Sequence, residues 1–184
     1  LKRVISAYTE KFLAHRQTEA NALHTGRVVC ATQNSSKPDL LRGISFRMFI
    51  EYIITQPPTR LDPHWAPQYF CLQSIATYTR VFRVDQLQQL RSALEDWTGA
   101  DITLDQLNTS MAAADPEKES LTQPGSAVDL MPQELDTLEN LTSADFMEPA
   151  LVKAIENYYA QDFELYHELA SSGDSFSPPP MEPG

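Results

Sequence analysis

Residues 1–12 read Leu1-Lys2-Arg3-Val4-Ile5-Ser6-Ala7-Tyr8-Thr9-Glu10-Lys11-Phe12. Apolar side chains recur in this stretch at intervals of three and four residues, at Val4, Ala7, Tyr8 and Phe12. This spacing predicts a helix with one buried face, which we expect to continue to about residue 22. Arg3 and Ser6 then lie one turn apart at the helix start, where free backbone N–H groups and the helix dipole favour an anion. The stretch is typical either of half a phosphate site or of an ordinary solvated helix start.

The next sixty residues are expected to form one further helix between loops. Residues 26–38 are mostly polar and predict a loop. Ser45 can cap a helix that ends near Thr55, before two consecutive prolines. The apolar face of this helix is formed by Phe46, Phe49, Ile50 and Ile53. Residues 61–71 are interrupted by prolines and predict another loop.

The second half of the chain has weaker patterns. Residues 75–84 alternate and are rich in β-branched and aromatic side chains, which predicts a strand. A helix is expected over residues 85–97, with Leu87, Leu90 and Leu94 facing inward. Residues 111–139 have the composition of a disordered or lightly structured insertion. A last helix is expected over residues 146–169, followed by an unstructured tail from 171 to 184.

Composition limits the classes of function. The 184 residues are 42% hydrophobic, which suits one domain with a core, and the formal net charge is −11. Such a charge argues against a nucleic acid bound over a broad surface. Basic residues nevertheless outnumber acidic ones in residues 1–91, and acidic ones dominate the rest. The basic half suits an anionic nucleotide or glycan, and the acidic half suits either a functional role or simple solubility.

The cysteines and histidines indicate no metal centre. Two cysteines, Cys30 and Cys71, permit one disulfide or two buried thiols. The four histidines and two cysteines have no zinc-type spacing, so we expect no metal. No run of 18 apolar residues occurs, which predicts no membrane contact within these residues.

Five short motifs follow one another in a set order along the chain. They are Arg-x-x-Ser-Ala-Tyr-x-x-Lys-Phe at residues 3–12, Ser45-Phe46-Arg47-Met48-Phe49-Ile50-Glu51-Tyr52, His64-Trp65-Ala66-Pro67-Gln68, Leu107-Asn108-Thr109-Ser110, and Tyr159-Ala160-Gln161-Asp162-Phe163-Glu164-Leu165-Tyr166. The series resembles the carbohydrate sulfotransferases of the chondroitin, dermatan and HNK-1 type and their bacterial relatives, sulfotransferase family 2. The resemblance covers residues 1–110 and 141–167, and its most specific element is the His-Trp-x-Pro-Gln run.

This resemblance implies an α/β fold similar to that of P-loop kinases, of which the chain would be the mainly helical C-terminal portion with few strands. Residues 1–110 would belong to the sulfotransferase domain, 111–140 to a low-complexity insertion, 141–170 to the final helix and 171–184 to a disordered tail. The implied reaction transfers a sulfuryl group from 3′-phosphoadenosine 5′-phosphosulfate to a carbohydrate hydroxyl. The implied partners are that nucleotide donor and a glycan, with no nucleic acid and no metal.

The family holds its donor at two places. One is a loop with Gly, Lys and Ser or Thr that binds the 5′-phosphosulfate, and no such loop occurs in these residues. The other is an Arg-x-Pro-x-x-Arg-x-x-Ser segment for the 3′-phosphate, whose last four positions match Arg3 to Ser6. Arg3 and Ser6 are therefore the expected donor contacts. We expect the chain to be an N-terminally truncated sulfotransferase that is inactive alone.

His64 is the candidate general base, because a sugar hydroxyl must lose its proton as it attacks sulfur. The alternative is that His64 only pins its proline-rich loop. Arg60 and Gln68 lie in the same segment and are candidate contacts for the acceptor. The resemblance implies the Golgi lumen, through a membrane anchor, for an animal member and the cytoplasm for a bacterial one.

A second hypothesis is a non-catalytic helical interaction protein that keeps the core of the family. The residues that a core would retain are Phe46, Phe49, Tyr52, Trp65, Tyr159 and Phe163. Binding of adenosine 3′,5′-bisphosphate separates the two hypotheses.

Overall fold

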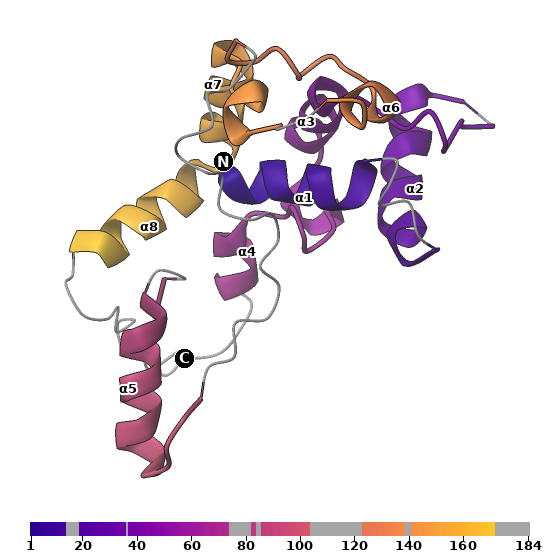
Figure 1. The fold of residues 1–184 in the computed structure, drawn as a ribbon. Helices are drawn as coiled ribbons and strands as arrows, with labels where there is room; N and C mark the ends of the chain where they lie inside the picture. The colour runs from indigo at the N-terminus through magenta and orange to yellow at the C-terminus, as the bar shows by residue number, and fades with distance from the viewer. Residues whose placement is uncertain are drawn as a thin grey trace, which may run out of the picture. The chain divides into compact units, whose positions relative to one another are not determined.

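The structure, a computed structural model, describes residues 1–13, 19–35, 37–73, 82–83, 86–103, 123–138 and 141–171. Within these ranges the chain forms helices joined by turns and contains no strand (Figure 1). The chain divides into two compact units. Unit 1 comprises residues 1–67 and 110–159, and unit 2 comprises residues 68–109 and 160–184. The helical character matches the mainly helical portion that the sequence predicts.

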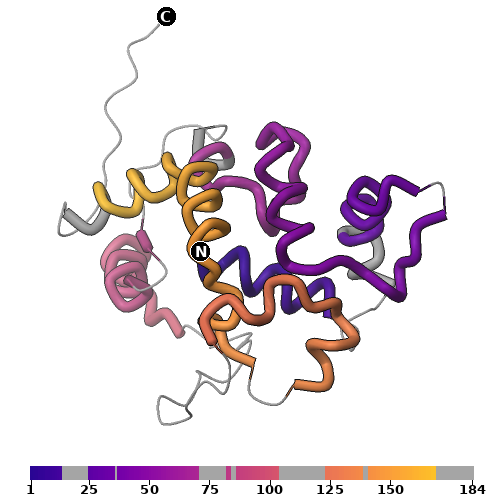
Figure 2. The backbone as a smooth tube through the Cα atoms, turned by 90° about the horizontal axis from the view of Figure 1, so that it is seen from above, coloured from indigo at the N-terminus to yellow at the C-terminus, as the bar shows by residue number. Residues whose placement is uncertain are grey.

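Within the described residues, unit 1 contains four helices of ten or more residues. Its helical elements are α1 (Lys2–Phe12), α2 (Glu19–Gln33), α3 (Phe46–Thr55), the 3₁₀ turn η2 (Pro58–Arg60), α6 (Pro132–Leu135), the 3₁₀ turn η4 (Ser143–Phe146) and α7 (Pro149–Tyr158). Helix α1 packs against α2 and η4, and α3 packs against α2 and α7. Figure 2 shows the segment that follows residue 123, in orange, passing beside the start of α3.

The core of unit 1 is a cluster of aromatic rings. Its members are Tyr8, Phe12, Phe46, Phe49, Trp65 and Phe146, and each side chain is at most 1% exposed. Neighbouring ring centroids in the cluster lie 4.9 to 6.4 Å apart, the range in which aromatic pairs add to the stabilisation from apolar burial. The Tyr8 hydroxyl donates to the Ile44 carbonyl at 2.9 Å, so its polar end is satisfied inside the core. Burial raises the pKa of the Tyr8 hydroxyl.

Helix α3 begins at the residue that the sequence predicts. The Ser45 hydroxyl accepts from the Met48 N–H, and the helix ends at Thr55. The predicted apolar face is buried, since Phe46, Phe49, Ile50 and Ile53 are all 0% exposed. A capped start, an unbroken apolar stripe and two prolines after the end together fix this element from local sequence.

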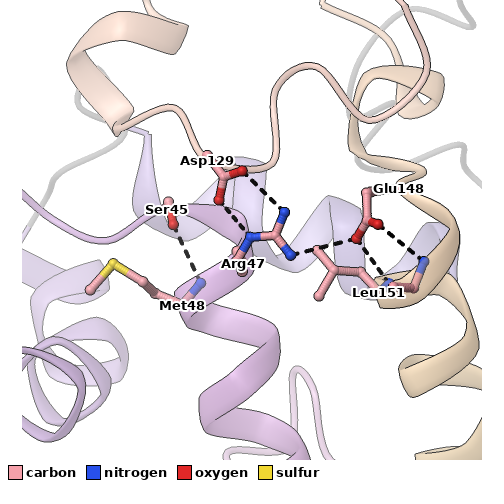
Figure 3. Close-up of polar contacts among 7 residues, drawn as sticks. Ser45, Arg47, Met48, Asp129, Glu148 and Leu151 are labelled. Carbon is pink, nitrogen blue, oxygen red and sulfur yellow. Dashed lines mark hydrogen bonds and ion pairs between the residues drawn. The ribbon is translucent and has the colours of Figure 1, made fainter.

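Arg47 joins α3 to two other segments of unit 1 (Figure 3). Its Nε and Nη2 donate to the two carboxylate oxygens of Asp129 at 2.6 and 3.0 Å. Its Nη1 lies 3.5 Å from Oε2 of Glu148, whose carboxylate also caps α7 by accepting from the N–H groups of Ala150 and Leu151. The bidentate contact raises the pKa of Arg47 and lowers that of Asp129.

Residues 123–138 are the described part of the segment that is expected to be a disordered or lightly structured insertion. They form a series of turns and α6, and they bury Ala127, Val128 and Leu135. Gly125 has φ of +81°, and a Cβ there would lie 2.9 Å from the Cα of Glu148. The few apolar residues of this acidic segment are spaced so that they reach the core, which overall composition does not reveal. The predicted division of the chain at residues 111–140 stays a prediction.

Unit 2 contains α4 (Gln68–Gln73), α5 (Leu87–Thr98) and α8 (Ala160–Ser171). Helix α4 packs against α8, where the Asp162 carboxylate accepts from the N–H groups of Gln68 and Tyr69, both at 2.8 Å. Helix α5 lies close to its predicted range and ends at Thr98, before Gly99, which has φ of +66°. The inward-facing role predicted for its leucines is wrong for Leu87, which is 47% exposed, and α5 has no fully buried residue.

Four predicted boundaries in the chain are wrong. The helix predicted over residues 2–22 ends at Phe12, because Leu13 is extended with ψ of 144°. The loop predicted over 26–38 is helical to Gln33, with Val28 and Val29 buried. The predicted loop 61–71 contains the start of α4. The helix predicted over 146–169 is split into α7 and α8 at Tyr159, whose ψ of 23° interrupts the hydrogen-bond ladder.

Some predictions fall on residues outside the described ranges. They include most of the strand predicted at 75–84, the Leu107 to Ser110 motif and the tail from residue 172. These stay predictions.

Candidate functional site

The predicted general base lies on a tight turn of unit 1, residues Asp62–Ala66, which we call the His64 turn. The Asp62 carbonyl accepts from the N–H groups of Trp65 and Ala66, at 3.0 and 2.8 Å. The Asp62 carboxylate oxygen Oδ1 accepts from the His64 N–H at 2.9 Å. Asp before Pro is a common turn start, since a short carboxylate can bind backbone N–H groups two residues on. The turn is thus held from within by its first residue.

The His64 turn is also held from outside. Nη2 of Arg3 donates to the carbonyls of Pro63 and Ala66, at 2.8 and 3.0 Å. The Tyr159 hydroxyl donates to the carbonyl of Trp65, which lies between them in the chain. Three carbonyls of the turn therefore bind side chains from α1 and from the end of α7, so its backbone conformation is tightly fixed.

The Trp65 side chain anchors the turn to the core. It is 1% exposed, and its ring lies 5.4 Å from that of Phe49 and 6.1 Å from that of Phe12. Its Nε1 is buried and has no hydrogen-bond partner within the described part of the chain. Trp65 is thus a packing residue whose neighbour His64 faces outward.

His64 forms a close pair with Asp62. Its Nδ1 lies 2.5 Å from Oδ1 of Asp62. The His64 side chain is 44% exposed, whereas the Asp62 side chain is 20% exposed. A carboxylate can only accept, so the contact places a proton on Nδ1 and leaves Nε2 as the basic nitrogen of the neutral ring. The pair has the groups that general-base catalysis requires.

The structure brings one of the predicted donor contacts, Arg3, against the turn that carries the predicted base. Arg3 and Ser6 are both half-buried and lie one turn apart on α1, as expected. Nη2 of Arg3 is used by the His64 turn, as described above. Ser6 accepts a hydrogen bond from the Thr9 hydroxyl at 3.2 Å through its backbone carbonyl, and its side-chain hydroxyl takes no part in this bond. Arg3 thus links the two parts of the site that the sequence predicts separately.

The predicted acceptor contacts lie in different units. Arg60 is exposed at the end of η2 in unit 1. Gln68 is exposed in unit 2, where its backbone N–H binds Asp162. The roles predicted for both stay predictions.

Sequence reasoning missed two residues of the site, Asp62 and Tyr159. Asp62 could have been found from Asp-Pro-His, because an aspartate two residues before a histidine in a turn can reach its ring. Tyr159 was assigned to the core, where it is indeed 5% exposed, but its hydroxyl bond to the turn depends on the tertiary fold.

Neither a metal centre nor a disulfide accompanies the site in the described residues. No group of three or more His, Cys, Asp or Glu side chains there could hold a metal ion. Cys30 lies exposed on α2 as a free thiol. The same residues include no helix with the length and apolar character needed to cross a membrane.

The geometry defines a class of site: a histidine–carboxylate pair on a clamped turn, next to an arginine at a helix start, as suits group transfer with an anionic donor. The family model of the sulfotransferase family matches residues 1–167. The chain therefore belongs to the sulfotransferase family, which makes it a member of a transferase family with a sulfate donor and an acceptor substrate. No curated protein and no solved structure matches the chain.

Proposed function

We propose that this chain carries the 3′-phosphate contact and the general base of a carbohydrate sulfotransferase that uses 3′-phosphoadenosine 5′-phosphosulfate. The observation that carries the proposal is the contact of Arg3 with the carbonyls on both sides of His64 and Trp65. It links a residue that matches the donor motif of the family to the turn that holds the candidate base. Family membership supplies the reaction class.

Arg3 has donors to spare for a phosphate. A guanidinium carries five N–H donors in a planar fork, and the two carbonyl bonds of Arg3 both use Nη2. The remaining N–H groups lie on Nε and Nη1, on different sides of the guanidinium, so each can donate a single charge-assisted hydrogen bond to a phosphate oxygen, with the Ser6 hydroxyl one turn further along α1. The start of the helix adds a favourable dipole.

His64 would accept the proton of the acceptor hydroxyl at Nε2. The donor supplies the sulfuryl group, while the protein contributes orientation and a place for the proton. Asp62 holds Nδ1, so the ring presents Nε2 as its basic nitrogen. Arg60 and Gln68 remain the proposed contacts to the sugar.

The phosphosulfate-binding loop of the family is the part that these 184 residues do not contain. We therefore propose that turnover needs a phosphosulfate-binding loop that these residues do not supply, and that residues 1–184 alone bind but do not transfer. The coding sequence upstream of Leu1 tests this directly. It should encode Arg-x-Pro immediately before Leu1 and a Gly-x-x-Lys-x-Gly-(Ser/Thr) loop after a strand further upstream.

The test of the site is calorimetric binding of adenosine 3′,5′-bisphosphate to the chain. Ser6→Ala and Arg3→Ala should each weaken binding about tenfold or more, since hydrogen bonds to a charged group contribute about 1.5–3 kcal/mol. Arg3→Lys should weaken it too, because an ammonium cannot donate to the carbonyls and the phosphate in the same fork geometry. Lys2→Ala, an exposed neighbour on α1, is the matched control.

Two results would overturn the proposed site. Absence of binding in a chain extended upstream to include the loop would remove the donor function. Binding that is indifferent to both Arg3→Ala and Ser6→Ala would place the phosphate elsewhere. In the first case the non-catalytic helical interaction protein becomes the better reading, and the burial of Phe46, Phe49, Trp65 and Tyr159 fits it equally well.

A further inference from the structure

We infer that Asp62 is a positioning residue for His64, which fixes the tautomer and the direction of the imidazole ring. The inference deepens the proposed function and rests on it for its catalytic meaning. The structural claim itself concerns only residues of this chain. It assigns a role to a residue that the sequence motifs leave aside, since Asp62 precedes the His-Trp-x-Pro-Gln run.

A single carboxylate oxygen makes both contacts. Oδ1 of Asp62 accepts from the His64 backbone N–H at 2.9 Å and lies 2.5 Å from the ring Nδ1. The backbone and the ring of His64 are thus held by the same atom, which sets the side-chain rotamer as well as the proton position. An ionised carboxylate accepts only, so the nitrogen that faces it must carry hydrogen.

The carboxylate is itself well fixed. The backbone of Asp62 is part of the turn, where its carbonyl accepts two N–H groups. The turn is tied to α1 through Arg3, to the end of α7 through Tyr159 and to the core through Trp65. A ring held by a rigid acceptor loses little further freedom when a substrate arrives, which is the benefit of preorganisation.

The two side chains of the pair differ in their exposure to solvent. The His64 side chain is 44% exposed and the Asp62 side chain 20% exposed. A carboxylate with less water around it forms a stronger contact with the ring, whereas an acceptor can reach a histidine side chain that is 44% exposed.

The experiment is ¹⁵N NMR of the His64 imidazole in the whole chain, at a pH where the ring is neutral, with the resonances assigned by their loss in His64→Ala. We expect the wild type to show a protonated Nδ1 and an unprotonated Nε2. In Asp62→Ala the proton should move, so that Nε2 shifts to the range of a protonated nitrogen. Asp62→Asn, whose amide oxygen can still accept from both groups, should retain the wild-type pattern in part.

A purely structural role of Asp62 would give a different result. It would unfold or loosen the turn, seen in the Trp65 and Ala66 amide resonances, without a defined change of tautomer. The matched control is Asp39→Ala, because the Asp39 carboxylate also accepts a backbone N–H in a turn, that of Arg42 at 2.9 Å, and contacts no histidine among the side chains that the structure describes. Asp39→Ala should leave the His64 resonances unchanged.

A wild-type ring protonated on Nε2, or a tautomer that is the same in wild type and Asp62→Ala while the turn stays folded, would overturn the inference. Neither measurement uses a donor or an acceptor. Failure here therefore leaves the bisphosphate-binding result standing, and loss of bisphosphate binding leaves the tautomer result standing. The two claims can fail separately.

Discussion

A single hydroxyl bonds the most buried tyrosine of the described residues to the backbone. Tyr8 is 0% exposed, and its hydroxyl donates to the Ile44 carbonyl. Tyr8→Phe removes the donor and leaves a buried carbonyl without that partner, so we expect a loss of about 1–3 kcal/mol in the free energy of unfolding. Urea denaturation measures it. Tyr52→Phe is the control, since Tyr52 is half-buried on α3; equal effects of the two changes would contradict the prediction.

The same residue predicts how stability responds to alkali. Burial raises the pKa of Tyr8 above its ordinary value of 10.0, so the folded state keeps its proton when the unfolded state has begun to lose it. The contribution of the protonated Tyr8 hydroxyl to the stability of the fold is fully present below pH 10 and is lost as the pH rises above it. Between pH 9 and pH 11, the free energy of unfolding should decrease less steeply with pH in Tyr8→Phe than in the wild type. A parallel fall in both proteins would show that Tyr8 is not the group responsible.

Individual site residues were predictable where a motif names them, and their contacts were not. Arg3 and His64 follow from the resemblance to the family, but the bonds from Arg3 reach carbonyls 60 and 63 residues away in the chain. Such a bond depends on how the chain returns over α1, which no local pattern describes. Asp62 is the intermediate case, because its position two residues before His64 makes the contact possible without requiring it.

At the scale of elements, two glycines of unit 1 should respond to alanine in opposite directions. Gly125 has φ of +81°, and a Cβ would lie 2.9 Å from the Cα of Glu148. Gly125→Ala should therefore cost about 2–4 kcal/mol, from left-handed strain and from crowding at the cap of α7. Gly26 lies inside α2 with nothing within 4 Å of its Cβ position. Gly26→Ala should stabilise by about 0.5–1 kcal/mol. Thermal unfolding of both variants measures the two changes in stability. A stabilising Gly125→Ala would contradict the left-handed conformation and the close contact described at Gly125.

The link between α3 and residues 123–138 should weaken in acid. The Arg47 hydrogen bond lowers the pKa of Asp129, so the stabilisation is present above the ordinary carboxyl pKa of 3.8 and is lost as the pH falls through the lowered value. Because the Arg47 and Asp129 side chains are 33% and 67% exposed, we expect a coupling of only about 0.5–1 kcal/mol at pH 7. A double-mutant cycle of Arg47→Ala and Asp129→Ala measures it. The coupling should shrink at pH 2 and in high salt; a coupling that persists in both would mean that the two side chains interact through packing.

Elements were predictable where every local signal agreed. Helix α3 has a serine cap, a four-residue apolar stripe and terminal prolines, and its bounds match the prediction. Helix α2 was missed because Gly26 and polar neighbours outweigh the short apolar run that includes Val28 and Val29, both buried. The breaks at Leu13 and Tyr159 interrupt patterns that continue on either side, so tertiary packing decides them. Periodicity indicates that residues are helical but not where one helix becomes two.

For the whole molecule, the sequence predicts mainly helical character and part of the aromatic core of unit 1, but not the division into two units. Tyr52 and Phe163, which are also predicted for the core, are only half-buried. The motif residues Phe46, Phe49 and Trp65 meet in the core although they come from separate segments. The boundary at residues 67 and 68 falls inside the His-Trp-x-Pro-Gln run, so one motif contributes to both units. Motif continuity in sequence therefore does not imply a single compact unit.

The two tryptophans of the chain provide a test of the packing of unit 1. Trp65 is 1% exposed in the core of unit 1, whereas Trp97 is 84% exposed on α5 in unit 2. In Trp97→Phe, the remaining emission from Trp65 should be blue-shifted, resist acrylamide quenching and shift to the red in one cooperative step during urea unfolding. In Trp65→Phe, the emission of Trp97 should be red-shifted and readily quenched before any denaturant is added. Red-shifted, quenchable emission from Trp65 in native buffer would mean that the aromatic core of unit 1 is not packed in solution. The conformation of the His64 turn depends on this core, so it would then not be present either.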